Sequence, residues 1–205
     1  ETEKTVKVLP IGASNVYGFI GFDGPYVADS NGNGWIDRAD FATNPDGSLG
    51  APLLVNDGTG GRPKAVGFAI QDLDLGVFVG LEVDAGAAGA GTGAPSLGVY
   101  VAADVSLERF GFVGLPGFTA VGTFGVQLNV GASTSGGFYA IDFEKSFPAH
   151  TDGEGAPVAM GYHVFTGDKN NPILLQYDDF LFKIELAGAI ELQNVFAVVG
   201  LFNLQ

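Results

Sequence analysis

Hydrophobic and polar residues alternate with a period of two along much of the chain. The odd-numbered residues from Val99 to Leu107 are apolar, and so are the even-numbered residues from Phe180 to Leu186. Alternation with this period is how a strand directs one face toward a core. Glycine recurs at short intervals, and each glycine inside a helix costs about 1 kcal/mol relative to Ala. The pattern therefore predicts an all-β fold with one helical turn, after Asp37.

Turn-forming residues divide the chain into two parts. Residues 23–63 are rich in Asn, Asp, Gly and Pro, which adopt the backbone angles of turns, whereas strand patterns continue almost without interruption from Ala65. We expect an N-terminal part, residues 1–63, with strands and a loop region, and a β-rich body, residues 64–205. The Ala/Gly run at residues 85–95 predicts either a flexible loop or a tight backbone contact.

Two segments of the chain resemble each other. Residues 118–127 and 196–205 share the pattern Phe-x-x-Val-Gly-x-Phe-x-(Val/Leu)-Gln. They indicate a possible internal repeat, at about residues 105–129 and 182–205, with chance similarity as the alternative. The second copy is an apolar strand at the end of the given chain. This ending predicts continuation into a longer chain or into a neighbouring subunit.

Composition excludes several classes of protein. The formal net charge is −14, so phosphates would repel the chain and no nucleic-acid partner is expected. The absence of Cys excludes disulfides, a thiol nucleophile and thiolate metal ligands. No apolar run approaches the roughly 20 residues that cross a bilayer, so no membrane span is predicted. The acidity and the scarcity of Lys favour an extracellular or cell-surface location, where divalent cations offset the charge.

The strongest local signal is the twelve-residue segment 29–40, which has the spacing of an EF-hand calcium loop. Ca²⁺ is a hard cation that takes about six to eight oxygen ligands. Gly34 occupies the sharply turning sixth position, and Ile36 is expected to fix the loop to a core. The expected ligands are Asp29, Asn31, Asn33, the backbone carbonyl of Trp35, Asp37 and Asp40.

Two departures from the usual loop narrow this prediction. The last position is the shorter Asp40 rather than Glu, as in dockerin-like loops, and no entering helix precedes Asp29. The sequence therefore predicts an isolated structural calcium site rather than a paired sensor. The alternative is an Asx/Gly turn that only resembles the loop.

Signals for catalysis are weak. His150 and His163 are the only histidines, and neither a His-x-x-x-His pair nor a Gly-x-Ser-x-Gly turn occurs, so no enzyme is predicted. Paired carboxylates for glycoside hydrolysis remain an open alternative. Three acidic pairs are either second cation sites or solvated turns and edges: Asp72 with Asp74, Asp152 with Glu154, and Asp178 with Asp179. Three aromatic residues form either a sugar-stacking patch or ordinary packing: Tyr17, Tyr26 and Trp35.

Three further segments point to a family. Residues 21–26 read Gly-Phe-Asp-Gly-Pro-Tyr, residues 67–76 read Gly-Phe-Ala-Ile-Gln-Asp-Leu-Asp-Leu-Gly, and residues 113–119 read Val-Gly-Leu-Pro-Gly-Phe-Thr. Together with the calcium loop, they resemble repeat units of giant bacterial calcium-binding extracellular proteins of the adhesin-like type. The resemblance implies a Ca²⁺-bound, β-rich repeat in a surface-anchored or secreted protein.

These observations lead to one expected fold and three candidate functions. The fold is all-β, either a β-solenoid-like form or an elongated β-sandwich, with an N-terminal calcium-loop segment. The first function is a structural extracellular module that Ca²⁺ stabilises and that associates end to end with copies of itself, as a surface-protein repeat or a filament subunit. A carbohydrate- or surface-binding adhesin domain is the alternative, and a hydrolase comes third.

Overall fold

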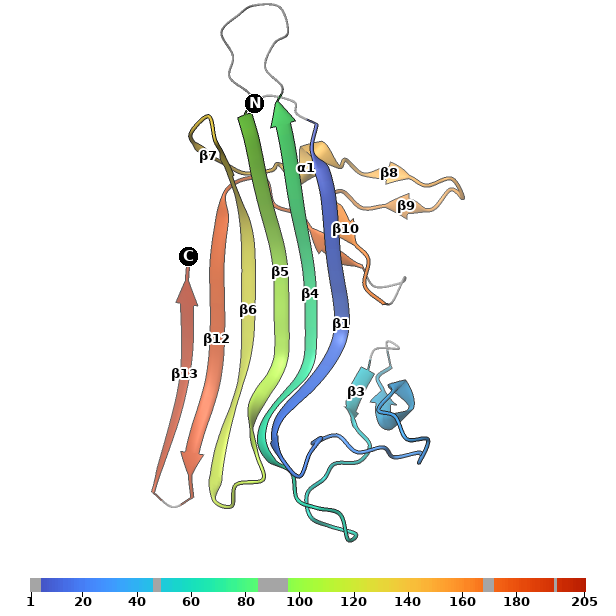
Figure 1. The fold of residues 1–205 in the computed structure, drawn as a ribbon, viewed down its shortest axis with the longest axis vertical. Helices are drawn as coiled ribbons and strands as arrows, with labels where there is room; N and C mark the ends of the chain where they lie inside the picture. The colour runs from blue at the N-terminus through green and yellow to red at the C-terminus, as the bar shows by residue number, and fades with distance from the viewer. Residues whose placement is uncertain (1–4, 46–48, 85–95, 168–171, 194) are drawn as a thin grey trace, which may run out of the picture.

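The computed structural model describes residues 5–45, 49–84, 96–167, 172–193 and 195–205. Its main element is a seven-stranded antiparallel sheet with the order β1-β4-β5-β6-β12-β13, in which β7 also pairs with β6 (Figure 1). The strands are β1 (Lys7–Phe22), β4 (Val66–Asp84), β5 (Ser96–Val113), β6 (Phe118–Ser133), β7 (Phe138–Tyr139), β12 (Leu181–Leu192) and β13 (Phe196–Leu204). The all-β prediction is confirmed. The described strands form an open sheet and no solenoid.

The strands are long because several glycines lie inside them rather than at their ends. A Cβ atom on Gly76 of β4 would lie 2.6 Å from Cγ2 of Ile173, and one on Gly12 of β1 would collide with the backbone of Phe165. Glycine here permits a second layer to approach the sheet closely. The Ala/Gly run at residues 85–95 lies outside the described residues.

Two insertions contribute the remaining elements. Residues 23–65, between β1 and β4, carry η1 (Arg38–Asp40), β2 (Phe41–Thr43) and β3 (Leu49–Pro52). Residues 140–180, between β7 and β12, carry α1 (Phe143–Ser146), β8 (His150–Thr151), β9 (Pro157–Val158), β10 (Tyr162–Val164) and β11 (Ile173–Leu175). The helical turn expected after Asp37 is confirmed as η1. A second short helix, α1, was missed, although Asp142 caps it by accepting a hydrogen bond from the Lys145 N–H at 2.9 Å.

The core lies between the sheet and the second insertion. The sheet contributes Phe78, Tyr100 and Ala102, and the insertion contributes Phe143, Val164 and Leu175. The rings of Phe78 and Phe143 meet edge to face, with centroids 5.2 Å apart, which is a favoured aromatic geometry. The insertion therefore covers one face of the sheet near its upper end in Figure 1.

The face of β5 that contacts this core is not the one that the sequence pattern suggests. The alternating apolar residues, Val99 and its successors, lie on the opposite face, whereas Tyr100 and Ala102 contact the second layer. The alternation predicted the strand correctly but its buried face wrongly. The physical reason is that alternation shows which face is apolar, not which neighbour covers it.

Backbone irregularities bend the lower third of the sheet (Figure 1). Asn15 in β1 and Asp72 in β4 have positive φ angles of 55° and 59°, and the pairing of β5 with β6 shifts between Leu107 and Phe110. Such bulges change the side-chain direction of the residues that follow. As a result, the apolar residues that precede Asp72 in β4 and those that follow it point to the same face of the sheet.

Candidate functional site

The predicted calcium loop, residues 29–40, is a series of Asx turns. Asp29 accepts backbone hydrogen bonds through both oxygens, from Gly32 N–H to Oδ1 and from Gly34 N–H to Oδ2, each at 2.6 Å. Asn31 and Asn33 accept from the N–H groups two residues ahead, at 2.9 and 2.8 Å. Gly32 and Gly34 have positive φ angles of 76° and 89°, which glycine adopts at little cost. The loop is therefore wound tightly around its polar side chains.

The end of the loop is tied back to its beginning through Asp40. Its Oδ1 accepts hydrogen bonds from the N–H and the hydroxyl of Ser30, at 2.6 and 2.9 Å, and its Oδ2 accepts one from Asp37 N–H at 2.8 Å. The Asp40 side chain is buried. The N–H groups of Asp37 and Ser30 stabilise its charged form and hold the pKa of this carboxyl below its ordinary value.

The loop segment is fixed to the sheet on the same side as the second insertion. The rings of Tyr17 in β1 and Phe41 in β2 pack against each other at a tilt, with centroids 4.2 Å apart, and Ala28 N–H donates to the Leu54 carbonyl at 3.0 Å. Ile36, expected to fix the loop to a core, is exposed instead, as is Trp35. Phe41, five residues further along the chain, fixes the loop segment to the sheet instead. The Tyr17 ring packs on Phe41, whereas Trp35 lies exposed in the loop, apart from this packing.

The donor set of the loop suits a hard cation, but its carboxylates are not gathered into a metal-ligating cluster. In the part of the chain that the structure describes, no group of three or more Asp, Glu, His or Cys side chains has that arrangement. Asn33 donates to Asp37 Oδ2 at 2.8 Å, so the two side chains already meet. Each carboxylate has about four lone-pair positions, and the hydrogen bonds that Asp29 and Asp37 accept from Gly32, Asn33, Gly34 and Ala39 occupy only part of them.

A shallow groove of about 750 Å³ crosses the sheet below the second insertion. It is lined by Asp72, Asp74, Glu108 and Glu185 among other residues. One oxygen of Asp72 is buried without a hydrogen-bond partner. Burial, a hydrogen bond to Glu108 and the charge of Asp74 raise the pKa of Asp72 to about 7.

The raised pKa gives a pH-dependent prediction. Because the folded form of Asp72 holds its proton more tightly than the unfolded form, its contribution to stability is present at low pH and is lost as the pH rises through about 7. We expect Asp72→Asn to raise Tm at pH 8 and to leave it nearly unchanged at pH 4. Asn also accepts the positive φ at this position. Thermal denaturation from pH 4 to 8 checks this, with the exposed Glu154→Gln as control. A difference in Tm that does not change with pH would contradict it.

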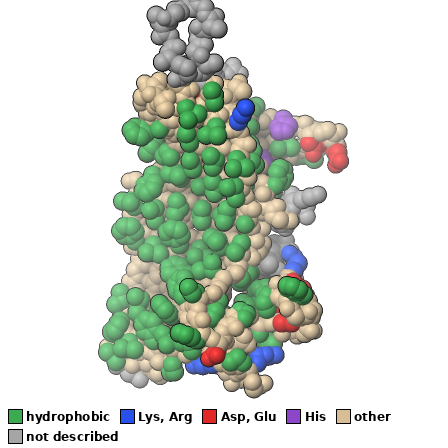
Figure 2. Space-filling view, viewed as in Figure 1, with side chains coloured by type: hydrophobic (Ala, Val, Ile, Leu, Met, Phe, Trp, Pro, Cys, Tyr) green, Lys and Arg blue, Asp and Glu red, His purple; other side chains and the backbone are tan. Residues whose placement is uncertain are grey.

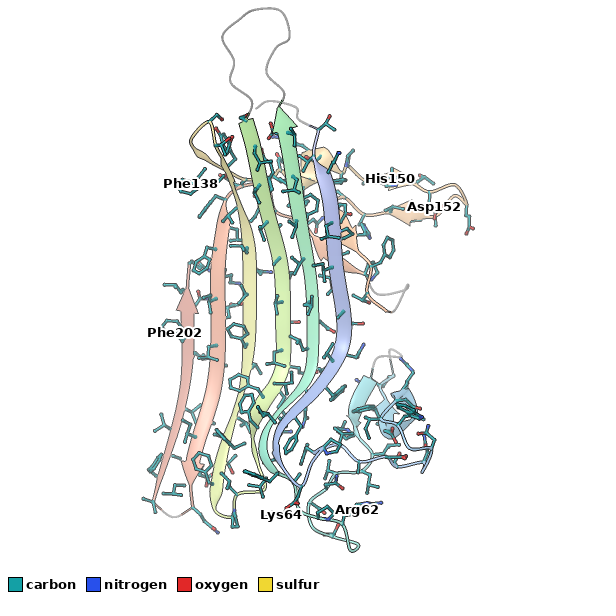
Figure 3. All side chains as sticks on the ribbon, viewed as in Figure 1. Arg62, Lys64, Phe138, His150, Asp152 and Phe202 are labelled. Atoms are coloured by element: carbon teal, nitrogen blue, oxygen red, sulfur yellow. The ribbon has the colours of Figure 1, made fainter. Side chains whose placement is uncertain are left out.

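The histidines lie apart from this groove. Figure 3 shows His150 and Asp152 on the β8–β9 hairpin, which projects away from the sheet. His150 Nδ1 lies 3.2 Å from the Pro148 carbonyl, and His163 Nε2 lies 3.1 Å from the Ala159 carbonyl. The groove lining contains no histidine. The expectation that the chain is not an enzyme stays a prediction.

The sheet face opposite the two insertions is almost entirely apolar, and we call it the apolar face. Residues paired across strands share a face, so the strand register defines its members. They are the odd-numbered residues of β1 from Lys7 to Ala13, of β4 from Leu73 to Val83 and of β5 from Leu97 to Leu107, and the even-numbered residues of β6, β12 and β13. Lys7 is the one charged residue in this set. Figure 2 shows the continuous hydrophobic surface that results.

The two similar segments found in the sequence flank the same strand. Residues 118–127 belong to β6 and residues 196–205 include β13, and both pair with β12. Gly188 of β12 faces Gly122 on one side and Gly200 on the other. β13 is the last strand of the sheet order and is exposed along its whole length, including Phe202 (Figure 3).

Comparison with known proteins gave no match to a family model, to a curated protein or to a solved structure. Among the described residues, no helix has the length and apolar character needed to cross a membrane.

Proposed function

We propose that the chain is a structural extracellular module that Ca²⁺ stabilises and that joins copies of itself edge to edge. The observation that carries the proposal is the open edge at β13. Its residues Val199 and Leu201 are 80% and 90% exposed. A flat, apolar edge strand presents unpaired backbone groups that a further strand can pair with.

The direction of the strands favours a second copy as the partner of β13. Every neighbouring pair in the order β1-β4-β5-β6-β12-β13 is antiparallel. The order contains an even number of strands, so the edge strands β1 and β13 run in opposite directions. A copy added with the same orientation brings its β1 antiparallel to β13. The contact is head to tail, and such contacts repeat without closing and produce filaments.

The similar segments support the same geometry. β6 and β13, which carry the two similar segments, pair with β12 in equivalent register. A further strand of the same kind could therefore be added to the sheet at β13. This holds for a neighbouring subunit and for a neighbouring repeat of a longer chain.

The proposed role of Ca²⁺ is to brace the loop against the sheet. Asp29, Asp37 and Asp40 carry three negative charges within twelve residues, and oxygen ligands at this spacing are those that Ca²⁺ prefers. The loop joins the sheet through Phe41 and Tyr17, at β1. A rigid loop would therefore hold the β1 edge in place. Extracellular calcium is abundant enough for such a site, which fits the proposed location.

Substituting lysine for apolar residues of the edge strand β13 tests the proposal. We expect Val199→Lys/Leu201→Lys to raise the concentration at which the protein assembles by about tenfold or more, because edge lysines oppose strand pairing. Both side chains point away from the apolar face and are exposed, so the fold should persist. Sedimentation and electron microscopy measure the assembly, and circular dichroism checks the fold.

A control with the same charge change separates edge pairing from general electrostatics. Gly153→Lys/Glu154→Gln also adds two positive units, in the exposed β8–β9 hairpin. This variant should assemble like the unmodified chain or more readily, because it makes the net charge less negative and so weakens the repulsion between copies. A wild-type chain that does not elongate with Ca²⁺ at high concentration, or an edge variant that still forms filaments, would overturn the proposal.

A further inference from the structure

The apolar face is too large to be an ordinary exposed surface. Leu9 is 60% exposed and Phe202 is 57% exposed, at opposite edges of the face, with exposed Leu, Ile and Val residues between them. The exposed apolar side chains of this face come from β1, β4, β5, β12 and β13, so the patch spans the sheet, whereas the largest patch on a soluble monomer is about 300–600 Å². A stable protein interface needs only about 800 Å² per partner. The face is therefore large enough for a tight interface.

The chain's own described segments do not cover this face. Phe41 packs on Tyr17, and Phe143 and Val164 pack on Phe78, all on the opposite side of the sheet. Both insertions thus lie on that side. Whatever covers the apolar face comes from outside the described residues.

The chemistry of the face selects an apolar, proteinaceous occupant. Lys7 is its only charged residue, so it offers nothing to an ionic or sugar ligand. The positions that define the face contain no Trp or Tyr, the residues that typically anchor a protein at a lipid headgroup region. A basic rim for anionic lipids is also missing from those positions. An apolar protein surface of the same size is the best complement.

We propose that the apolar face is covered by the apolar face of a second copy. Two sheets pack face to face at about 10 Å when their side chains interdigitate. Gly188 and Gly200, which carry no side chains, leave a depression at the β12–β13 side of the face, beside Leu186 and Phe202, whereas the Phe110 ring fills the space at Gly122. A depression next to a ridge lets two identical faces interlock about a two-fold axis.

The charge distribution fits this pairing. The acidic residues Asp74, Asp104 and Glu185 lie on the other side of the sheet. Face-to-face pairing therefore places the acids of both copies outward, separated by two sheet layers. The net charge of −14 per copy still opposes association, so pairing should strengthen as salt screens it. The edges β1 and β13 stay accessible at the sides, so face pairing is independent of the proposed edge contact.

The test uses the edge-blocked Val199→Lys/Leu201→Lys chain, in which only face pairing is left. We expect this chain to be a dimer at micromolar concentration by sedimentation equilibrium. Adding Val99→Lys and Leu186→Lys on the face should weaken the dimer at least a hundredfold. Adding Gly153→Lys/Glu154→Gln instead should not weaken it. Since all these changes bring the net charge of −14 closer to zero, a loss of pairing cannot come from a larger net charge.

The outcomes separate the two proposals. A monomeric edge-blocked chain, or a dimer that survives Val99→Lys/Leu186→Lys, overturns face pairing. Flotation of the edge-blocked chain with neutral phosphatidylcholine vesicles in place of dimerisation also overturns it. Filaments of the unmodified chain that are one sheet thick would leave the edge contact intact and reject face pairing. Dimers that form no filaments would leave face pairing intact and reject the edge contact.

Discussion

Replacing Phe143 by Ala should lower the free energy of unfolding by about 3–5 kcal/mol, the usual cost of removing a buried aromatic ring. Phe143 is fully buried, and its ring contacts Phe78, Phe147 and Tyr177, with centroids 5.2, 6.0 and 6.3 Å away. The helix α1 that carries it is only four residues long. Because a helix this short has little stability of its own, the ring holds the second layer on the sheet. Chemical denaturation measures the loss.

Phe138→Ala is the matched control for this prediction. Phe138 is 84% exposed in β7, so its truncation should change the free energy of unfolding by about 0.5 kcal/mol or less. The comparison is made at concentrations where the chain is monomeric. A similar effect of the two substitutions would mean that the insertion does not pack on the sheet as described.

Strand identity could be predicted from the sequence, but the layer arrangement could not. The alternation from Val99 to Leu107 lies in β5, and that from Phe182 to Leu186 lies in β12. The pattern does not specify that both insertions cover the other face. That outcome depends on small residues such as Ala102 and Gly76, which allow Phe143 and Ile173 to approach closely. Small residues carry little hydrophobic signal, so their role in packing appears only in three dimensions.

The candidate sites, too, could be predicted from the sequence only in part. The spacing of residues 29–40 predicted a tightly turning loop, and the positive φ angles of Gly32 and Gly34 agree with it. The docking residue was assigned to Ile36 instead of Phe41, because position eight of such a loop usually packs inward. The apolar face required the cross-strand register, which bulges such as the one at Asp72 adjust.

Asn33→Asp should change the stability of the loop in opposite directions with and without Ca²⁺. Asn33 donates to Asp37 Oδ2 at 2.8 Å, so the substitution removes this donor and places two carboxylates against each other. With a chelator, we expect a lower Tm. With millimolar Ca²⁺, the added charge should strengthen cation binding, because the affinity of such loops rises with the charge of their ligands. The variant should then bind Ca²⁺ about tenfold more tightly than the unmodified chain.

The control is Asn203→Asp, which repeats the chemistry outside the loop. Asn203 donates to Glu185 Oε1 at 3.4 Å, so this change also opposes two carboxylates, but at a pair of strands with no predicted calcium ligand. Ca²⁺ should not restore its Tm. Calorimetric titration gives the affinities, and thermal denaturation with and without chelator gives the stabilities. If Ca²⁺ fails to rescue Asn33→Asp, or rescues both variants equally, segment 29–40 is a structural Asx/Gly turn whose carboxylates serve only the backbone.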